Sequence, residues 1–107
     1  MMKTIKVFLI DKTGIQPVEL QLKNDDGLSH IRELIQAPLD ADIKTMPPLP
    51  TGETVLHADA QADFGFLCNG NAGEGAAIVA GYDPFTGELK DAQISLEQLA
   101  KLVMISV

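Results

Sequence analysis

Residues 4–10 read Thr-Ile-Lys-Val-Phe-Leu-Ile, and residues 18–23 read Val-Glu-Leu-Gln-Leu-Lys. Because side chains alternate between the two faces of a strand, the first stretch is apolar on most of both faces and the second on one face only. The polar residues 11–14 between them end in a glycine, which is typical of a β-hairpin. We therefore predict that the fold starts from a hairpin.

The apolar spacing becomes helical after the hairpin. Apolar residues recur at intervals of three and four over residues 28–35, and Asp26 or Ser29 is available to cap the first turn. Pro38 stops the helix. A helix at this place covers the aliphatic face of the second strand, which predicts a two-layer arrangement.

The second half of the chain predicts more strands and a second helix. In order, we expect strands at residues 54–60 and 64–68 that form a hairpin, a glycine-rich loop at 69–75 and a buried strand at 76–82. Ser95 begins the last helix, since Gln98 completes a capping box and Leu96, Leu99, Leu102 and Val103 form its apolar stripe. The expected fold is one α+β domain over residues 1–107, with a mainly antiparallel sheet and two short helices packed on one face.

Composition limits the classes of partner. The chain has 107 residues, the length of one domain, and 15 acidic against 8 basic side chains give a formal net charge of −7. This charge repels nucleic-acid phosphates and anionic lipids and attracts a basic protein surface. We therefore expect a protein partner, with a homodimer as a further option, and no nucleic acid.

Cysteine usage and hydropathy indicate the compartment. The single cysteine, Cys68, cannot form an internal disulfide. The longest aliphatic run, residues 76–80, is far shorter than the roughly 20 residues that span a bilayer. The sequence predicts a cytoplasmic protein that does not enter a membrane.

One polar trio has a spacing compatible with a metal site. His57 and Asp59 share a face of a predicted strand, and Asp63 lies just beyond it. One imidazole and two carboxylates fall short of a zinc site unless His30 also converges. The preferred interpretation is a solvent-facing row on an edge strand, and the alternative is a small metal-dependent hydrolase.

Cys68 and the glycine-rich loop at residues 69–75 are two further candidate functional sites. Cys68 has His57 as an available base, but it continues the alternating face of Phe64 and Phe66, which favours a core thiol. The glycines at residues 70–75 suit an anion or a nucleotide, but Glu74 repels phosphate and the lysine of a phosphate-binding loop is absent. We assign no catalytic, cofactor-binding or metal-binding residue.

The remaining candidates are exposed connections. Residues 38–52 contain four prolines and a glycine, which excludes a helix and predicts a surface loop. Loops held on a fixed sheet commonly carry recognition. The candidate binding surface consists of Met46, Pro47, Pro48, Leu49 and Pro50, together with Asn71 and Glu74.

Short segments of the second half resemble a known family. Asn69-Gly70-Asn71-Ala72, the aliphatic run bounded by glycines at 75 and 81, and Ser95-Leu96-Glu97 follow one another as in domain of unknown function 3846, an uncharacterised family of small phage and plasmid proteins. The prolines at 47–50 depart from its pattern. The resemblance implies a mobile-element setting, in which small acidic proteins often block host enzymes, and no established activity.

Together these features predict a small acidic cytoplasmic interaction protein of phage or plasmid type that acts by surface complementarity, without catalysis or a cofactor. Two other functions stay open. One is the hydrolase built on His57, Asp59 and Asp63, and the other is a nucleotide-binding module built on the glycine-rich loop.

Overall fold

The structure, a computed structural model, describes residues 3–22 and 27–106. In chain order the elements are β1 (Lys3–Asp11), β2 (Gly14–Leu22), α1 (Leu28–Leu34), β3 (Ile43–Thr45), β4 (Thr54–Ala58), β5 (Gly65–Cys68), β6 (Asn71–Glu74), β7 (Ala77–Tyr82), β8 (Leu89–Lys90), α2 (Leu96–Leu102) and β9 (Val103–Ser106). All strand pairs among the described residues are antiparallel. The predicted α+β class with a mainly antiparallel sheet is confirmed.

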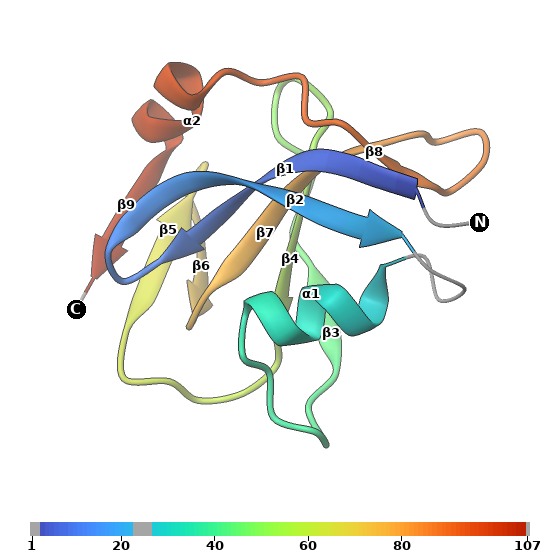
Figure 1. Ribbon diagram of the computed structural model, residues 1–107. Helices are drawn as coiled ribbons and strands as arrows, with labels where there is room; N and C mark the ends of the chain where they lie inside the picture. The colour runs from blue at the N-terminus through green and yellow to red at the C-terminus, as the bar shows by residue number, and fades with distance from the viewer. Residues whose placement is uncertain (1–2, 23–26, 107) are drawn as a thin grey trace.

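The strands form two sheets (Figure 1). Sheet A has the order β2-β1-β7-β4-β3, with β8 added to β7, and sheet B has the order β6-β5-β9. The predicted N-terminal hairpin is present, and its register places Val7 opposite Val18 and Asp11 opposite Gly14. The predicted buried strand is β7, which lies between β1 and β4 at the centre of sheet A.

Both faces of sheet A are covered, which explains why β1 and β7 are apolar on both sides. Ile78 and Ala80 of β7 belong to one core cluster with Leu20 of β2 and Ile31 of α1. On the opposite face, Ala77 and Val79 join a second cluster that contains Phe66 and Cys68 of sheet B and Leu99 of α2. The protein therefore has three layers, with sheet A in the middle.

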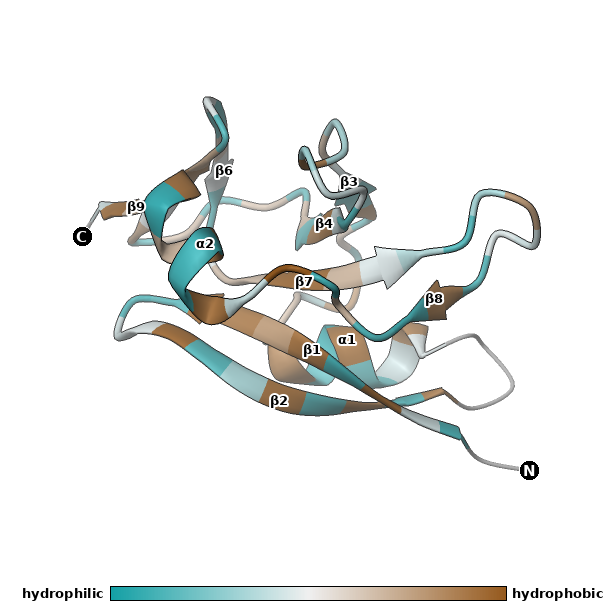
Figure 2. Cartoon of the chain, turned by 90° about the horizontal axis from the view of Figure 1, so that it is seen from above, coloured by the Kyte–Doolittle hydropathy of each residue, from teal (hydrophilic) through white to brown (hydrophobic). Residues whose placement is uncertain are grey.

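The expectation that both helices pack on one face is wrong. Helix α1 contributes Ile31 to the first cluster, whereas α2 contributes Leu99 to the second. In Figure 2 the two helices lie on different sides of β1 and β7. A seven-residue helix cannot cover both apolar faces of a central strand, so each face needs its own cover.

The ends of the helices agree in part with the sequence prediction. The N-cap residue of α1 is Gly27 and not Ser29, which lies within the first turn of the helix, and Asp26 lies outside the described residues. The capping box at the start of α2 is confirmed, since the Ser95 Oγ accepts from the Gln98 N–H and the Gln98 side chain accepts from the Ser95 N–H. Val103, predicted in the helical stripe, begins strand β9 instead.

The predicted hairpin between residues 54–60 and 64–68 is also wrong. Strand β4 pairs with β3 and β7 in sheet A, whereas β5 pairs with β6 and β9 in sheet B. The expected loop at 69–75 contains β6, which follows a tight Asn69-Gly70 turn with both residues at positive φ. Glycine is suited to β6 because a Cβ on Gly73 would lie 2.6 Å from the Phe66 ring and 2.7 Å from the Met46 methyl group.

Candidate functional site

The trio His57, Asp59 and Asp63 does not assemble into a metal site. Among the described residues, no group of three His, Cys, Asp or Glu side chains is placed to hold an ion. The Asp59 carboxylate pairs with Lys44 Nζ at 3.1 Å on the surface, whereas Asp63 faces a different pocket. His30 is held elsewhere, because its Nδ1 accepts a hydrogen bond from the Gln21 backbone N–H at 2.9 Å.

The preferred interpretation of His57 as part of a solvent-facing edge row is wrong as well. Strand β4 is an interior strand of sheet A, and the half-buried His57 ring contacts the Phe66 ring edge-on at a centroid distance of 6.2 Å. Its Nδ1 lies 3.2 Å from the Ala58 carbonyl oxygen. His57 therefore serves as packing between the two sheets.

Cys68 is a core thiol, as its alternation with Phe66 predicted. Its side chain is buried in the cluster between sheet A and sheet B. Burial raises the pKa of the Cys68 thiol. A buried thiol with a raised pKa is a poor nucleophile at neutral pH.

The proline loop, residues 46–52, is only partly a surface. Met46 and Leu49 are buried in the core, so the expectation that the whole loop is exposed is wrong for these two residues. Pro47, Pro48 and Pro50 point outward and are exposed. The two apolar side chains thus anchor the loop, and the three proline rings form its outer surface.

Hydrogen bonds fix the shape of the proline loop. The Met46 N–H donates to the Val55 carbonyl at 3.0 Å, and the Leu49 N–H donates to the Glu53 carbonyl at 3.0 Å. The Gly52 N–H donates to the Leu49 carbonyl at 2.8 Å, in a turn where Gly52 has a φ of 93°. These bonds join the loop to the start of β4.

Glu53 ties the loop to the segment before α2. Its side chain is fully buried, and its carboxylate accepts hydrogen bonds from the Thr51 hydroxyl, from the Gln93 N–H at 2.7 Å and from the Ile94 N–H at 3.0 Å. Burial alone raises the pKa of this carboxyl, but the hydrogen bonds outweigh it and the pKa lies below its usual value. The carboxylate is therefore ionised and structural at neutral pH.

A shallow groove of about 320 Å³ lies beside the proline loop. Pro50 and Thr51 form one wall, and Ile94 and the α2 residues Gln98, Lys101 and Leu102 form the other. Because Glu53 bonds to both sides of this groove, it holds the two walls at a fixed separation. Pro50 thus belongs both to the exposed prolines and to the groove, and Lys101 contributes a cationic side chain to the groove lining.

The other two predicted surface residues, Asn71 and Glu74, lie on β6 of sheet B. Asn71 is half-buried and its Nδ2 donates to the Asn69 carbonyl at 3.4 Å, whereas Glu74 is exposed. Glu74 lines a small cavity with Gly75 and Gln36. Gly73, which lies between these two residues in the chain, packs against Met46, the buried anchor of the proline loop.

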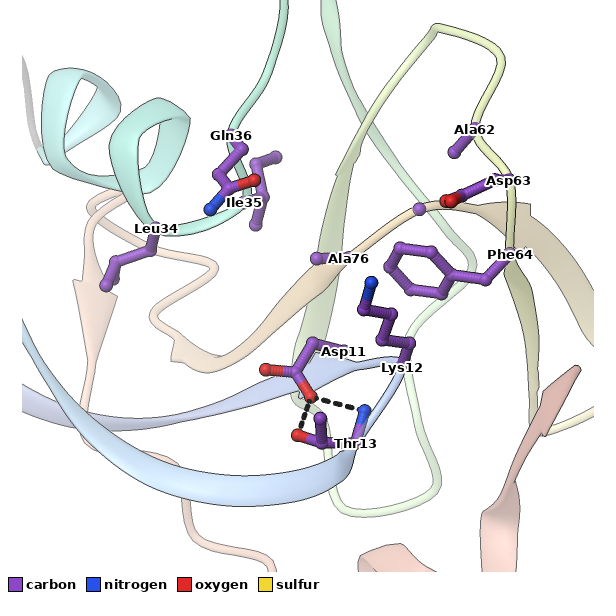
Figure 3. A pocket seen from close by; sticks show the side chains of 11 residues that line it. Asp11, Lys12, Thr13, Leu34, Ile35, Gln36, Ala62, Asp63, Phe64 and Ala76 are labelled. Carbon is purple, nitrogen blue, oxygen red and sulfur yellow. Dashed lines mark hydrogen bonds between the residues drawn. The ribbon is translucent and has the colours of Figure 1, made fainter. Parts of the chain in front are cut away.

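A larger pocket, which we name the end pocket, was not predicted from the sequence (Figure 3). Its volume is about 440 Å³. It is lined by the β1–β2 turn (Asp11, Lys12, Thr13), the last residue of α1 and the two that follow it (Leu34, Ile35, Gln36), the segment before β5 (Ala62, Asp63, Phe64) and the segment before β7 (Gly75, Ala76). Four segments far apart in the chain build it, so no local motif marks it.

Gln36 occupies an unusual backbone position at the rim of the end pocket. It follows the last turn of α1 with a φ of 54°, its N–H donates to the Glu33 carbonyl, and the Ala37 N–H donates to the Arg32 carbonyl. This is a Schellman C-cap, in which glycine is the preferred residue at the left-handed position. A glutamine there costs about 1 kcal/mol relative to glycine.

Comparison with family models, with curated proteins and with solved structures finds no match for this chain. The resemblance to the phage and plasmid family therefore stays a prediction. Within the described residues, no helix is both long and apolar enough to cross a membrane.

Proposed function

We propose that this protein is an interaction protein that presents the proline loop to a protein partner with a basic surface, and that it has no catalytic activity of its own. The observation that supports this function best is the anchoring of the loop. Met46, Leu49 and Glu53 are all buried, and the proline rings beside them are exposed. A surface that is already ordered loses little conformational entropy on binding.

The chemistry of the surface indicates the kind of partner. Proline-rich segments are recognised by grooves lined with aromatic side chains, which stack on the flat faces of the rings. The formal net charge of −7 attracts a partner whose groove is surrounded by basic residues. Such a complex weakens as salt concentration rises, because salt screens the attraction. Occupying that groove would block the partner's other ligands, in keeping with an inhibitor of a host protein.

Site-directed photocrosslinking in the producing cell tests this proposal. A photoreactive residue in place of Pro48 is expected to capture a discrete partner, whereas the same residue in place of Phe85, which is also exposed and apolar, is expected not to capture it. In the chain that carries the photoreactive residue at position 48, the further changes Pro47→Ser and Pro50→Ser are expected to abolish capture of the partner without changing the melting temperature of that chain. Equal capture with and without these two changes, in a folded protein, would refute the proposal.

A further inference from the structure

Two side chains of opposite charge face the end pocket, and neither has an ion-pair partner in the described part of the chain. Lys12 extends into the pocket from the β1–β2 turn, and Asp63 faces it from the segment before β5 (Figure 3). Among the described residues, the one ion pair is that of Lys44 with Asp59. The Lys12 ammonium and the Asp63 carboxylate are therefore available to a ligand.

Asp11, the third charged residue in the lining of the end pocket, makes hydrogen bonds within the β1–β2 turn. The Asp11 carboxylate accepts hydrogen bonds from the Thr13 N–H at 2.9 Å, from the Thr13 hydroxyl at 2.6 Å and from Gln16 Nε2 at 3.5 Å. These bonds fix the β1–β2 turn and with it the start of the Lys12 side chain. The charges left for recognition are one cation and one anion.

The rest of the lining is suited to a small molecule with an apolar part. Leu34, Ile35, Phe64 and Ala76 contribute hydrocarbon surface, and Gln36 contributes an amide that both donates and accepts hydrogen bonds. Gln36 keeps this side chain at a position where glycine is the more stable choice. A residue that departs from a local preference at the rim of a pocket indicates a role in binding.

We propose that the end pocket binds a small zwitterion of the amino-acid class with an apolar side chain. Its carboxylate pairs with Lys12, its ammonium group pairs with Asp63, and its side chain lies against Phe64 and Ile35. A simple anion would meet the carboxylates of Asp63 and Asp11, and a simple cation would meet Lys12, so only a ligand with both charges is matched.

This site is independent of the proline loop. The loop precedes β4 and the segment carrying Asp63 follows β4, so the two surfaces lie at opposite ends of that strand. A ligand in the end pocket therefore leaves the proline loop accessible, and each proposal can fail without the other.

Titration with L-leucine, followed by NMR of the protein backbone, tests the proposal. Saturable shifts are expected at residues 11–13, 34–36, 62–64 and 75–76. Leucinamide, which lacks the carboxylate, and 4-methylpentanoate, which lacks the ammonium group, are each expected to bind at least about tenfold more weakly, the loss expected for one charge-assisted contact. Binding of either analogue as tightly as L-leucine, or no saturable shift with L-leucine, L-phenylalanine or L-methionine, overturns the proposal.

Matched variants distinguish a specific effect of Lys12 and Asp63 on ligand binding from an effect of the net charge of the protein. Lys12→Met and Asp63→Asn are each expected to weaken L-leucine binding about tenfold, whereas Lys44→Met and Asp59→Asn, which change the exposed ion pair outside the pocket, are expected to leave it unchanged. Gln36→Gly is expected to raise the melting temperature and to weaken binding. The proposed site is contradicted if the Lys44 and Asp59 variants weaken L-leucine binding as much as the Lys12 and Asp63 variants do. Tighter binding of L-leucine by Gln36→Gly contradicts it as well.

Discussion

Glu53 shows how one residue can fix the geometry of a candidate binding surface. Its carboxylate receives two backbone N–H groups from the segment before α2 and one hydroxyl from its own loop. Removing one partner of a buried charged network leaves the others unsatisfied, which costs more than the net contribution of the bonds. The proline loop and the groove beside Pro50 therefore depend on this one side chain.

The variant Glu53→Gln is expected to lower the free energy of unfolding by about 2 kcal/mol. The amide oxygen can take the place of Oε2 and still accept from the Gln93 and Ile94 N–H groups, but it carries no charge, and the NH₂ group in the place of Oε1 cannot accept from the Thr51 hydroxyl. Urea denaturation measures the change, and Glu33→Gln on the exposed side of α1 is the matched control, with an expected effect within about 0.5 kcal/mol. Similar midpoints for the two variants would show that Glu53 contributes no more than a surface carboxylate.

The lowered pKa of Glu53 also sets a pH dependence. A carboxyl whose pKa is lower in the folded than in the unfolded protein stabilises the fold above its unfolded pKa, and this contribution is lost as pH falls through the folded pKa. The wild type is therefore expected to lose more stability on acidification below about pH 4.5 than Glu53→Gln does. Parallel pH curves for the two proteins would contradict this assignment.

Sequence reasoning could not identify Glu53. It sits among Thr51, Gly52 and Thr54, a context typical of an exposed turn, and its partners Gln93 and Ile94 lie 40 and 41 residues further along the chain. Burial of a carboxylate depends on such long-range partners, which leave no local pattern. In contrast, Cys68 was assigned correctly because its burial follows from alternation with Phe66.

At the level of elements, the start of α2 shows that a short sequence motif can determine where a helix begins. Its start at Ser95 follows from the capping box alone. Ser95→Ala is expected to lower the free energy of unfolding by about 1 kcal/mol, because the Gln98 N–H loses its acceptor. Thermal denaturation measures the loss, and Thr86→Ala, in the exposed turn between β7 and β8, is expected to have a smaller effect. Equal effects would mean that the cap contributes nothing specific to α2.

Strands with a long alternating apolar pattern could be predicted from the sequence. Which strands pair with each other in the sheets could not be predicted. The nine-residue strands β1 and β2 and the buried β7 match the alternation in the sequence. The short strands β6 and β9 were not predicted. The glycines in and around β6 favour a loop, and Val103, the first residue of β9, fits the helical spacing of the apolar residues in α2. Pairing β5 with β9 rather than with β4 depends on contacts about 40 residues apart, which local periodicity does not encode.

At the scale of the whole molecule, the candidate sites differ in how visible they are in the sequence. The proline loop is a single segment, so its prolines identified it directly, although the burial of Met46 and Leu49 required the structure. The end pocket combines residues 11–13 with residues 62–64 and two further segments. Only the three-layer fold brings them together, and Lys12 and Asp63 carry no signal of their proximity.

Net charge is a property of the whole molecule that affects stability. The formal charge of −7 makes the folded chain repel itself, and only one ion pair among the described residues, Lys44 with Asp59, offsets this locally. Raising NaCl from about 10 mM to about 150 mM shortens the Debye length from roughly 30 Å to roughly 8 Å and screens the repulsion. We expect the melting temperature to rise by about 4 °C or more, which corresponds to about 1 kcal/mol in a domain of this size.

The double variant Asp40→Asn, Asp42→Asn separates this effect from nonspecific actions of salt. Both side chains are exposed and make no hydrogen bond or ion pair among the described residues, so the substitution changes charge with little change in packing. The variant is expected to melt at a higher temperature than the wild type at low salt and to gain less on adding NaCl. A melting temperature that falls as salt is added would mean that attraction between charges outweighs repulsion in the folded chain.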